Sequence, residues 1–112
     1  MDEVNNSNEL DSMAIILHIG NAKSEAYEAL KAVKKGDLET FNQKYELAKK
    51  ELSIGHRAHA EMLRKLSAEE RMKDVDLLMV HAEGHLSSTD IAVDMVGELG
   101  ELYKWKEIID EN

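Results

Sequence analysis

The sequence predicts an all-α protein, an antiparallel three-helix bundle. Proline and cysteine are absent and only 4% of the residues are aromatic, a composition that favours helices over strands. Apolar residues also recur at alternating spacings of three and four along three long segments, which is the period of a helical face. At 112 residues the chain is expected to form one domain over 12–112, preceded by a polar tail over 1–11.

The first predicted helix follows the tail and ends at a glycine. Gly36 can adopt the left-handed conformation that ends a helix, and Lys34 and Lys35 suit the negative C-terminal end of the helix. Asp37 follows as a candidate N-cap, so the connection is short and the next helix runs antiparallel. The apolar face of this first helix is formed by Ile15, Ile19, Ala22, Ala26, Ala29 and Val33.

The second predicted helix carries a stripe of apolar positions spaced strictly by three and four, which is typical of a coiled-coil-like packing seam. Two members of the stripe are unusual. Gly55 allows a neighbouring helix to approach closely, and His59 needs a polar partner at a buried position. The stripe consists of Leu38, Phe41, Tyr45, Ala48, Leu52, Gly55, His59, Met62 and Leu66.

The third predicted helix has two candidate starts, a capping box at Ser67 and an N-cap at Asp74, and it runs to about Ile109. Its polar face is narrow. A helix that is apolar over most of its circumference must be covered on more than one side, so we expect self-association through it. Two stripes inside a monomeric bundle are the alternative. The stripes are Val75, Leu78, Ala82, His85, Thr89, Ala92, Val96, Leu99 and Tyr103, and Leu77, His81, Gly84, Ser88, Ile91, Met95 and Leu102.

Charge and composition exclude several classes of function. The formal net charge of −9 argues against binding nucleic acid, which requires clustered Lys and Arg. No apolar run approaches the length of a membrane span, and the acidic, polar start of the chain is unlike a signal peptide, so a soluble cytoplasmic protein is expected. The absence of cysteine excludes disulfides, zinc–thiolate sites and a thiol nucleophile.

Five histidines are the candidate functional residues. His81 and His85 are four residues apart and project from one face of the third helix, while His56 and His59 are three apart. Both spacings can bring two imidazoles to one metal ion, although a third ligand is not apparent. His18 is expected to be hydrogen-bonded or partly exposed, and His56 to reach solvent.

The His81–His85 pair has three interpretations: satisfied polarity in the core, metal ligation, or nucleophilic chemistry. A neutral imidazole is well suited to accept and release a phosphoryl group, because its ordinary pKa of about 6.5 leaves the nucleophilic form dominant at neutral pH. Spacing alone does not decide among the three.

The segment around His81 resembles a family signature. The run L-L-M-V-H-A-E-G-H-L over 77–86 is similar to the pattern L-L-x-V-H-A-Q-D-H-L of the lactose/cellobiose-type enzyme IIA component of the bacterial phosphoenolpyruvate-dependent sugar phosphotransferase system. The run G-N-A-K-S over 20–24 resembles the family's G-D-A-R-S, and the resemblance covers about residues 13–106. It implies a three-helix bundle that forms a homotrimer, with the active histidine in a cleft between protomers.

The resemblance also implies roles for individual residues. His81 corresponds to the histidine that takes a phosphoryl group from the phosphocarrier protein HPr and passes it to the cysteine of enzyme IIB. The membrane component IIC, which imports the sugar, would be only an indirect partner of this chain, through enzyme IIB. His85 and Ser88 are candidate hydrogen-bond donors to the phosphoryl group, and no cofactor is expected. The alternative is a regulatory or interaction bundle of the same family that does not turn over phosphate.

Several positions depart from the family pattern, and among them the family's Met and Thr are Ser87 and Ser88 here. The family's Asp, which can share a metal ion near the trimer axis, is Gly84 here, so we expect no metal at that position. The family's Gln is Glu83, which should point away from His81 because it lies two residues further along the helix. The second-helix Gln of many relatives is His59, which would bring a second imidazole near the cleft.

Overall fold

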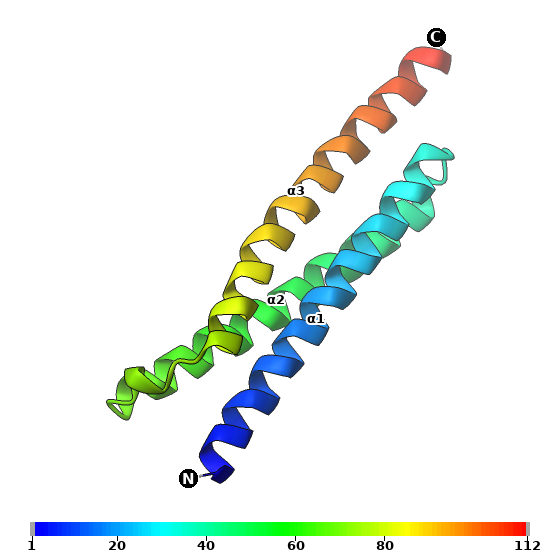
Figure 1. The fold of residues 1–112 in the computed structure, drawn as a ribbon. Coiled ribbons are helices and arrows are strands. Elements are labelled where there is room, and N and C mark those ends of the chain that lie inside the picture. Colours follow the sequence, from blue (N-terminus) through cyan, green and yellow to red (C-terminus); the bar gives the residue numbers. More distant parts are fainter. Residues whose placement is uncertain (1, 112) are drawn as a thin grey trace.

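The computed structural model describes residues 2–111, and the side chains of residues 9–110, as three long helices. Helix α1 spans Asp2–Lys34, α2 spans Leu38–Ala68, a short 3-10 helix η1 spans Met72–Asp74, and α3 spans Leu77–Glu111. Successive long helices run antiparallel (Figure 1). No strand occurs among residues 2–111, so the predicted all-α three-helix bundle is confirmed.

The first helix begins earlier than expected. Helix α1 starts at Asp2, so it runs through the segment that we expected to be a separate tail over 1–11. Residue 1 and the side chains of 1–8 lie outside the described part of the chain. Glu9, Leu10 and Asp11 are exposed, and the first buried side chain is Ser12. The polar composition therefore marks where α1 leaves the core, rather than where the helix begins.

The turn between α1 and α2 has the predicted chemistry. Gly36 has a φ of 82°, and the amides of Gly36 and Asp37 donate to the carbonyls of Val33 and Ala32, as in a Schellman motif. The Asp37 side chain accepts a hydrogen bond from the Thr40 amide at 3.1 Å. Hydrogen bonding to the Thr40 side chain and then to its amide lowers the pKa of the Asp37 carboxyl. The tight turn places α2 antiparallel to α1.

The connection between α2 and α3 differs from both predicted starts. Ser67 lies in the last turn of α2, and Asp74 accepts from Arg71 Nε at 2.8 Å, so its carboxylate is engaged within the loop. Asp76 is the cap instead, because its side chain accepts from the Met79 amide at 2.9 Å. The third helix therefore begins at Leu77, just after the predicted interval.

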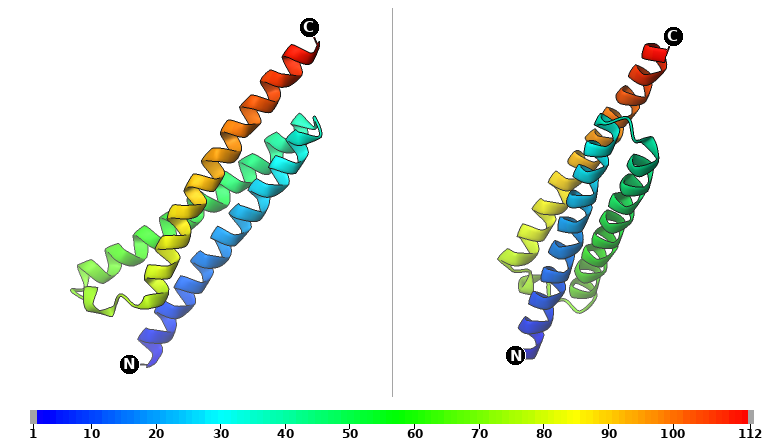
Figure 2. Two further views of the ribbon diagram at one scale, coloured as in Figure 1. Left: turned by 45° about the horizontal axis from the view of Figure 1, so that its top comes forward. Right: turned by 90° about the vertical axis from the view of Figure 1, so that its right-hand side faces the viewer.

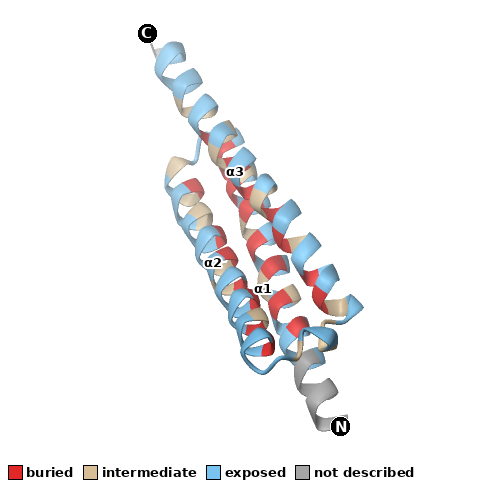
Figure 3. Ribbon diagram, turned by 90° about the vertical axis from the view of Figure 1, so that its left-hand side faces the viewer, coloured by how far each residue is buried: buried red, intermediate tan, exposed pale blue. Residues whose placement is uncertain are grey.

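The core lies along α1, which packs against both α2 and α3. All six apolar positions predicted for the first helix are buried, and seven of the nine stripe positions on α2 are buried with them. Figure 3 shows the buried residues facing inward on all three helices. On α3, however, the large core residues Met79, Leu86 and Val93 belong to neither predicted stripe. Periodicity therefore found the buried residues Ala82, Thr89 and Val96 of the first stripe but missed these three larger core residues.

Two glycines of α3 allow close packing against α2. The rings of Phe41 and Tyr45 stack with centroids 5.5 Å apart and lie over the backbone of Gly97 and Gly100, where a Cβ atom would overlap them. Partial burial raises the pKa of the Tyr45 hydroxyl. Beyond this contact α3 continues past the α1–α2 turn (Figure 2).

Replacing Gly100 by alanine should lower the free energy of unfolding by about 1–3 kcal/mol, because the methyl group overlaps the Phe41 ring. Gly20 is the matched control, since a Cβ atom there meets no heavy atom within 4 Å. Gly20→Ala should raise stability by up to about 1 kcal/mol through helix propensity. Urea unfolding followed by circular dichroism measures both. Equal stability of Gly100→Ala and the native chain would contradict the contact.

Candidate functional site

The imidazoles of His81 and His85 lie against each other near the start of α3. The Asp76 cap fixes the first turn, and the spacing of four residues then puts both side chains on one side of the helix. Their Nε2 atoms are 3.0 Å apart, and the rings meet edge to face with centroids 4.4 Å apart. His81 is exposed and His85 is half-buried, so the pair is accessible from solvent.

The contact between the two Nε2 atoms constrains the proton positions. A hydrogen bond between two neutral imidazole nitrogens needs one N–H donor and one lone pair, so the two rings take opposite tautomers. When His85 donates, His81 carries its proton on Nδ1 and keeps the Nε2 lone pair. In that form the Nε2 lone pair of His81 accepts from His85, and it becomes available as a nucleophile when this hydrogen bond opens.

Gly84 and Ser88 lie beside the pair. A shallow concavity of about 210 Å³ is lined by His81, Gly84, His85 and Ser88. Gly84 leaves the space open, since a Cβ atom there would meet nothing within 4 Å. The Ser88 hydroxyl donates to the backbone carbonyl of His85 at 3.2 Å. The structure thus brings together the three predicted site residues, and the only imidazole close to His81 is that of His85.

The pair lies at the edge of an apolar face that no other part of the described chain covers. Every member of the second predicted stripe, from Leu77 to Leu102, is exposed. Leu77 is 83% exposed and Ile91 66%, and both lie on the side of α3 opposite the core. Large apolar side chains in such a line indicate an interaction surface. The protomer therefore leaves a second apolar side of α3 exposed, as the sequence predicted.

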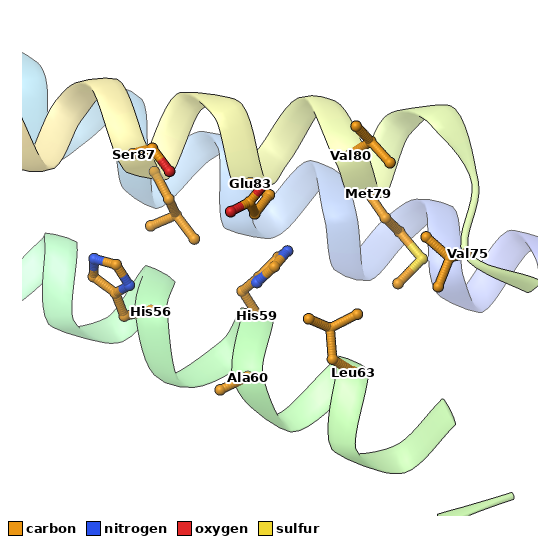
Figure 4. Close-up of a pocket in the computed structure, with 10 residues that line it drawn as sticks. His56, His59, Ala60, Leu63, Val75, Met79, Val80, Glu83 and Ser87 are labelled. Carbon is orange, nitrogen blue, oxygen red and sulfur yellow. The ribbon is translucent and has the colours of Figure 1, made fainter. Parts of the chain in front are cut away.

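A second hollow lies on another side of α3. Glu83 and His59 line this hollow and not the concavity around the histidine pair. This groove, of about 440 Å³, runs between α2 and α3 and is lined by His56, His59, Ala60, Leu63, Val75, Met79, Val80, Glu83, Leu86 and Ser87. Figure 4 shows His59 and Glu83 directed into the space between the two helices. Glu83 thus points away from His81, as the helical spacing predicted.

His59 differs from its prediction. It is 8% exposed and makes no hydrogen bond within the described part of the chain, although we expected a polar partner for it. Its ring edge borders the groove between α2 and α3, where water can reach it. Within one protomer it is not part of the concavity around His81.

The remaining histidines hold neighbouring helices together. His18 Nδ1 lies 2.6 Å from Glu51 Oε2 and links α1 to α2, and His56 Nε2 lies 2.6 Å from Asp90 Oδ1 and links α2 to α3. His18 is partly buried and His56 is exposed, as predicted. No group of three or more His, Cys, Asp or Glu side chains among the described residues is arranged to hold a metal ion. Nor is any helix within them long and apolar enough to cross a membrane.

Known sequences match most of the chain. The family model for the PTS system, Lactose/Cellobiose specific IIA subunit, matches residues 11–104. The lichenan-specific phosphotransferase enzyme IIA component of Bacillus subtilis (strain 168) is 41% identical over 90 residues, which cover 80% of this chain and 81% of that protein. The N,N'-diacetylchitobiose-specific EIIA component of Escherichia coli (strain K12) is 33% identical over 92 residues, covering 82% and 78%.

Solved structures share the fold. The crystal structure of the PTS cellobiose-specific enzyme IIA from Bacillus anthracis superimposes with a TM-score of 0.81 at 28% identity, covering 89% of this chain and 91% of that one. The IIA(chitobiose) chain in the Escherichia coli IIA(chitobiose)–HPr complex superimposes with a TM-score of 0.79 at 30% identity, covering 88% and 95%. The chain therefore belongs to the lactose/cellobiose-specific IIA family of the sugar phosphotransferase system.

Proposed function

We propose that this protein is a cytoplasmic phosphocarrier that takes a phosphoryl group from phospho-HPr on His81 and passes it to the cysteine of a cognate enzyme IIB during disaccharide uptake. The observation that carries the proposal is the contact between the exposed His81 and His85 inside the family motif, with Nε2 atoms 3.0 Å apart. HPr as the donor is supported by the related IIA(chitobiose), whose solution structure is a complex with HPr.

The geometry supports an in-line transfer. The lone pair on His81 Nε2 forms the new bond to phosphorus while the bond from phosphorus to the donor breaks. The Nε2–H of His85, which His81 accepts in the resting state, is then free to donate to a phosphoryl oxygen. The Ser88 hydroxyl, now bound to its own helix backbone, can rotate to become a second donor. In the second half-reaction the thiolate of enzyme IIB attacks the same phosphorus and restores neutral His81.

We also propose that the apolar face of α3 forms the interface of a homotrimer. The exposed residues Leu77, Ile91, Met95 and Leu102 share one stripe with Gly84, which has no side chain to separate neighbouring helices. Gly84 also offers no metal ligand, so the assembly needs no ion at this position. His81 lies on the same stripe, so in such a trimer it would lie beside a neighbouring protomer.

The regulatory alternative rests on Glu83 and Gly84, which depart from the Gln and Asp of the family pattern. Glu83 lines the α2–α3 groove and is absent from the concavity of His81, so its charge does not oppose a phosphoryl group within the protomer. Docking must rely on local complementarity, because a chain of net charge −9 attracts partners over long range only where those partners carry basic patches.

Phosphorylation by phosphoenolpyruvate, enzyme I and HPr should give an acid-labile adduct on the native chain. We expect none on His81→Ala, and we expect His85→Ala to react roughly 10²-fold more slowly, because it lacks one donor to the transferred group. His56→Ala is the matched control, because this histidine is also exposed and paired but lies outside the concavity, and its rate should be unchanged. Failure of the native chain to form an adduct with matched partners would favour the regulatory alternative.

Assembly can be tested separately from phosphotransfer. Ile91→Glu should dissociate the trimer, because it places a charge in the apolar stripe. Leu47→Glu is the control and should leave the trimer intact, because Leu47 is an exposed residue of α2 outside that stripe. Sedimentation equilibrium gives the oligomeric state of each variant. EDTA should leave the native trimer intact. A trimer that falls apart with EDTA and contains Mg²⁺ would contradict the expectation at Gly84.

A further inference from the structure

We infer that His81 and His85 form a bidentate site for a divalent ion that prefers imidazole ligands, Cu²⁺, Ni²⁺ or Zn²⁺, and that the bound ion blocks His81. The binding site follows from the geometry of the histidine pair alone. Its effect on phosphotransfer rests on the proposed function.

The distance between the two nitrogens suits a chelated ion. Metal–imidazole bonds are about 2.0–2.1 Å long, so two Nε2 atoms 3.0 Å apart subtend an angle of about 94° at a shared metal ion. This angle is near that of adjacent positions in square-planar and octahedral coordination, which Cu²⁺ and Ni²⁺ prefer. Both imidazoles line the open concavity on the surface of α3.

Among the five histidines this pair alone is free to bind such an ion. The ring nitrogens of His18 and His56 that face other helices are engaged by Glu51 and Asp90, and His59 is buried. Within the described residues, the only side-chain partner of either His81 or His85 is the other. No carboxylate has to be displaced from either imidazole, and the open concavity beside Gly84 leaves room for water on the remaining coordination positions.

The protons balance without another reactant. In the free protein one hydrogen lies between the two Nε2 atoms. Binding requires a lone pair on both, so the ring that carries Nε2–H changes to the Nδ1–H tautomer through solvent, and both imidazoles stay neutral.

The ion and the phosphoryl group compete for one atom. Proposed phosphorylation uses the Nε2 lone pair of His81, and the metal ion would occupy that same lone pair. A chain that carries the ion cannot accept a phosphoryl group on His81. A chain phosphorylated on His81 has only the imidazole of His85 left to bind the ion. The site is therefore an inhibitory one, reversed by a chelator.

Calorimetric titration of the metal-free full chain with CuCl₂ or ZnCl₂ tests binding directly. We expect one ion per chain on the native protein and roughly 10²-fold weaker binding by His81→Ala and His85→Ala, because the second ligand adds its contribution within one molecule. His56→Ala should bind like the native chain, and MgCl₂ should not bind. Circular dichroism confirms that each variant is folded. Undiminished affinity in His85→Ala, or an equal loss in His56→Ala, would overturn the site.

The spectrum of bound Cu²⁺ and the phosphotransfer assay separate the two parts of the inference. Electron paramagnetic resonance should report two imidazole nitrogens on the native chain and fewer on His85→Ala. Adduct formation should stop when the chain is saturated with Zn²⁺ and return with EDTA, with HPr alone serving as the control for inhibition of the donor. Binding without any adduct under any condition would remove the proposed function but keep the site. Full phosphorylation at metal saturation would overturn the blockade.

Discussion

The fold depends on how closely α1 approaches the other two helices. Ala22, Ala26 and Ala29 are almost completely buried, and Ile19 lies 3.5 Å from the position of a Cβ atom on Gly55 of α2. Small side chains on α1 thus bring its backbone near both neighbours, so dispersion contacts are dense there. Helices α2 and α3 share a narrower contact, held by two glycines under aromatic rings, and separate towards the groove at their other end.

This arrangement explains why the site is exposed. Because α1 occupies the inner face of α3, the opposite face has no partner among the described residues of the protomer, and the histidine pair lies between the covered and uncovered sides. The proposed role of His81, which would meet two different proteins in turn, needs such a position, since burial would prevent either protein from reaching it. The same exposure makes the pair open to small ions. Access for partners and vulnerability to metals thus have a common structural cause.

The sequence predicted the helices and the closeness of His81 and His85 better than it predicted the contacts between helices. Gly36 and Asp37 act through local backbone chemistry, so the first turn could be predicted in full. Asp74 could not be distinguished from Asp76 as the cap, because Arg71 engages Asp74 only after the loop has folded. Periodicity identifies apolar faces without saying which one a partner helix covers, and so it missed Met79, Leu86 and Val93 as the core of α3.

Self-association would couple the stability of the last turns of α3 to assembly. Glu107 lies beside Gly36 at the α1–α2 turn, and the helix continues beyond this point with Ile108 and Ile109 both about half exposed or more. Isolated helical turns are marginal in water and open locally at little cost, so amide hydrogens here exchange faster than those at the centre of α3. Association that covers these side chains would also hold the last turns in the helical state. The fraction of molecules in which these turns are helical would then rise with the concentration of protomers.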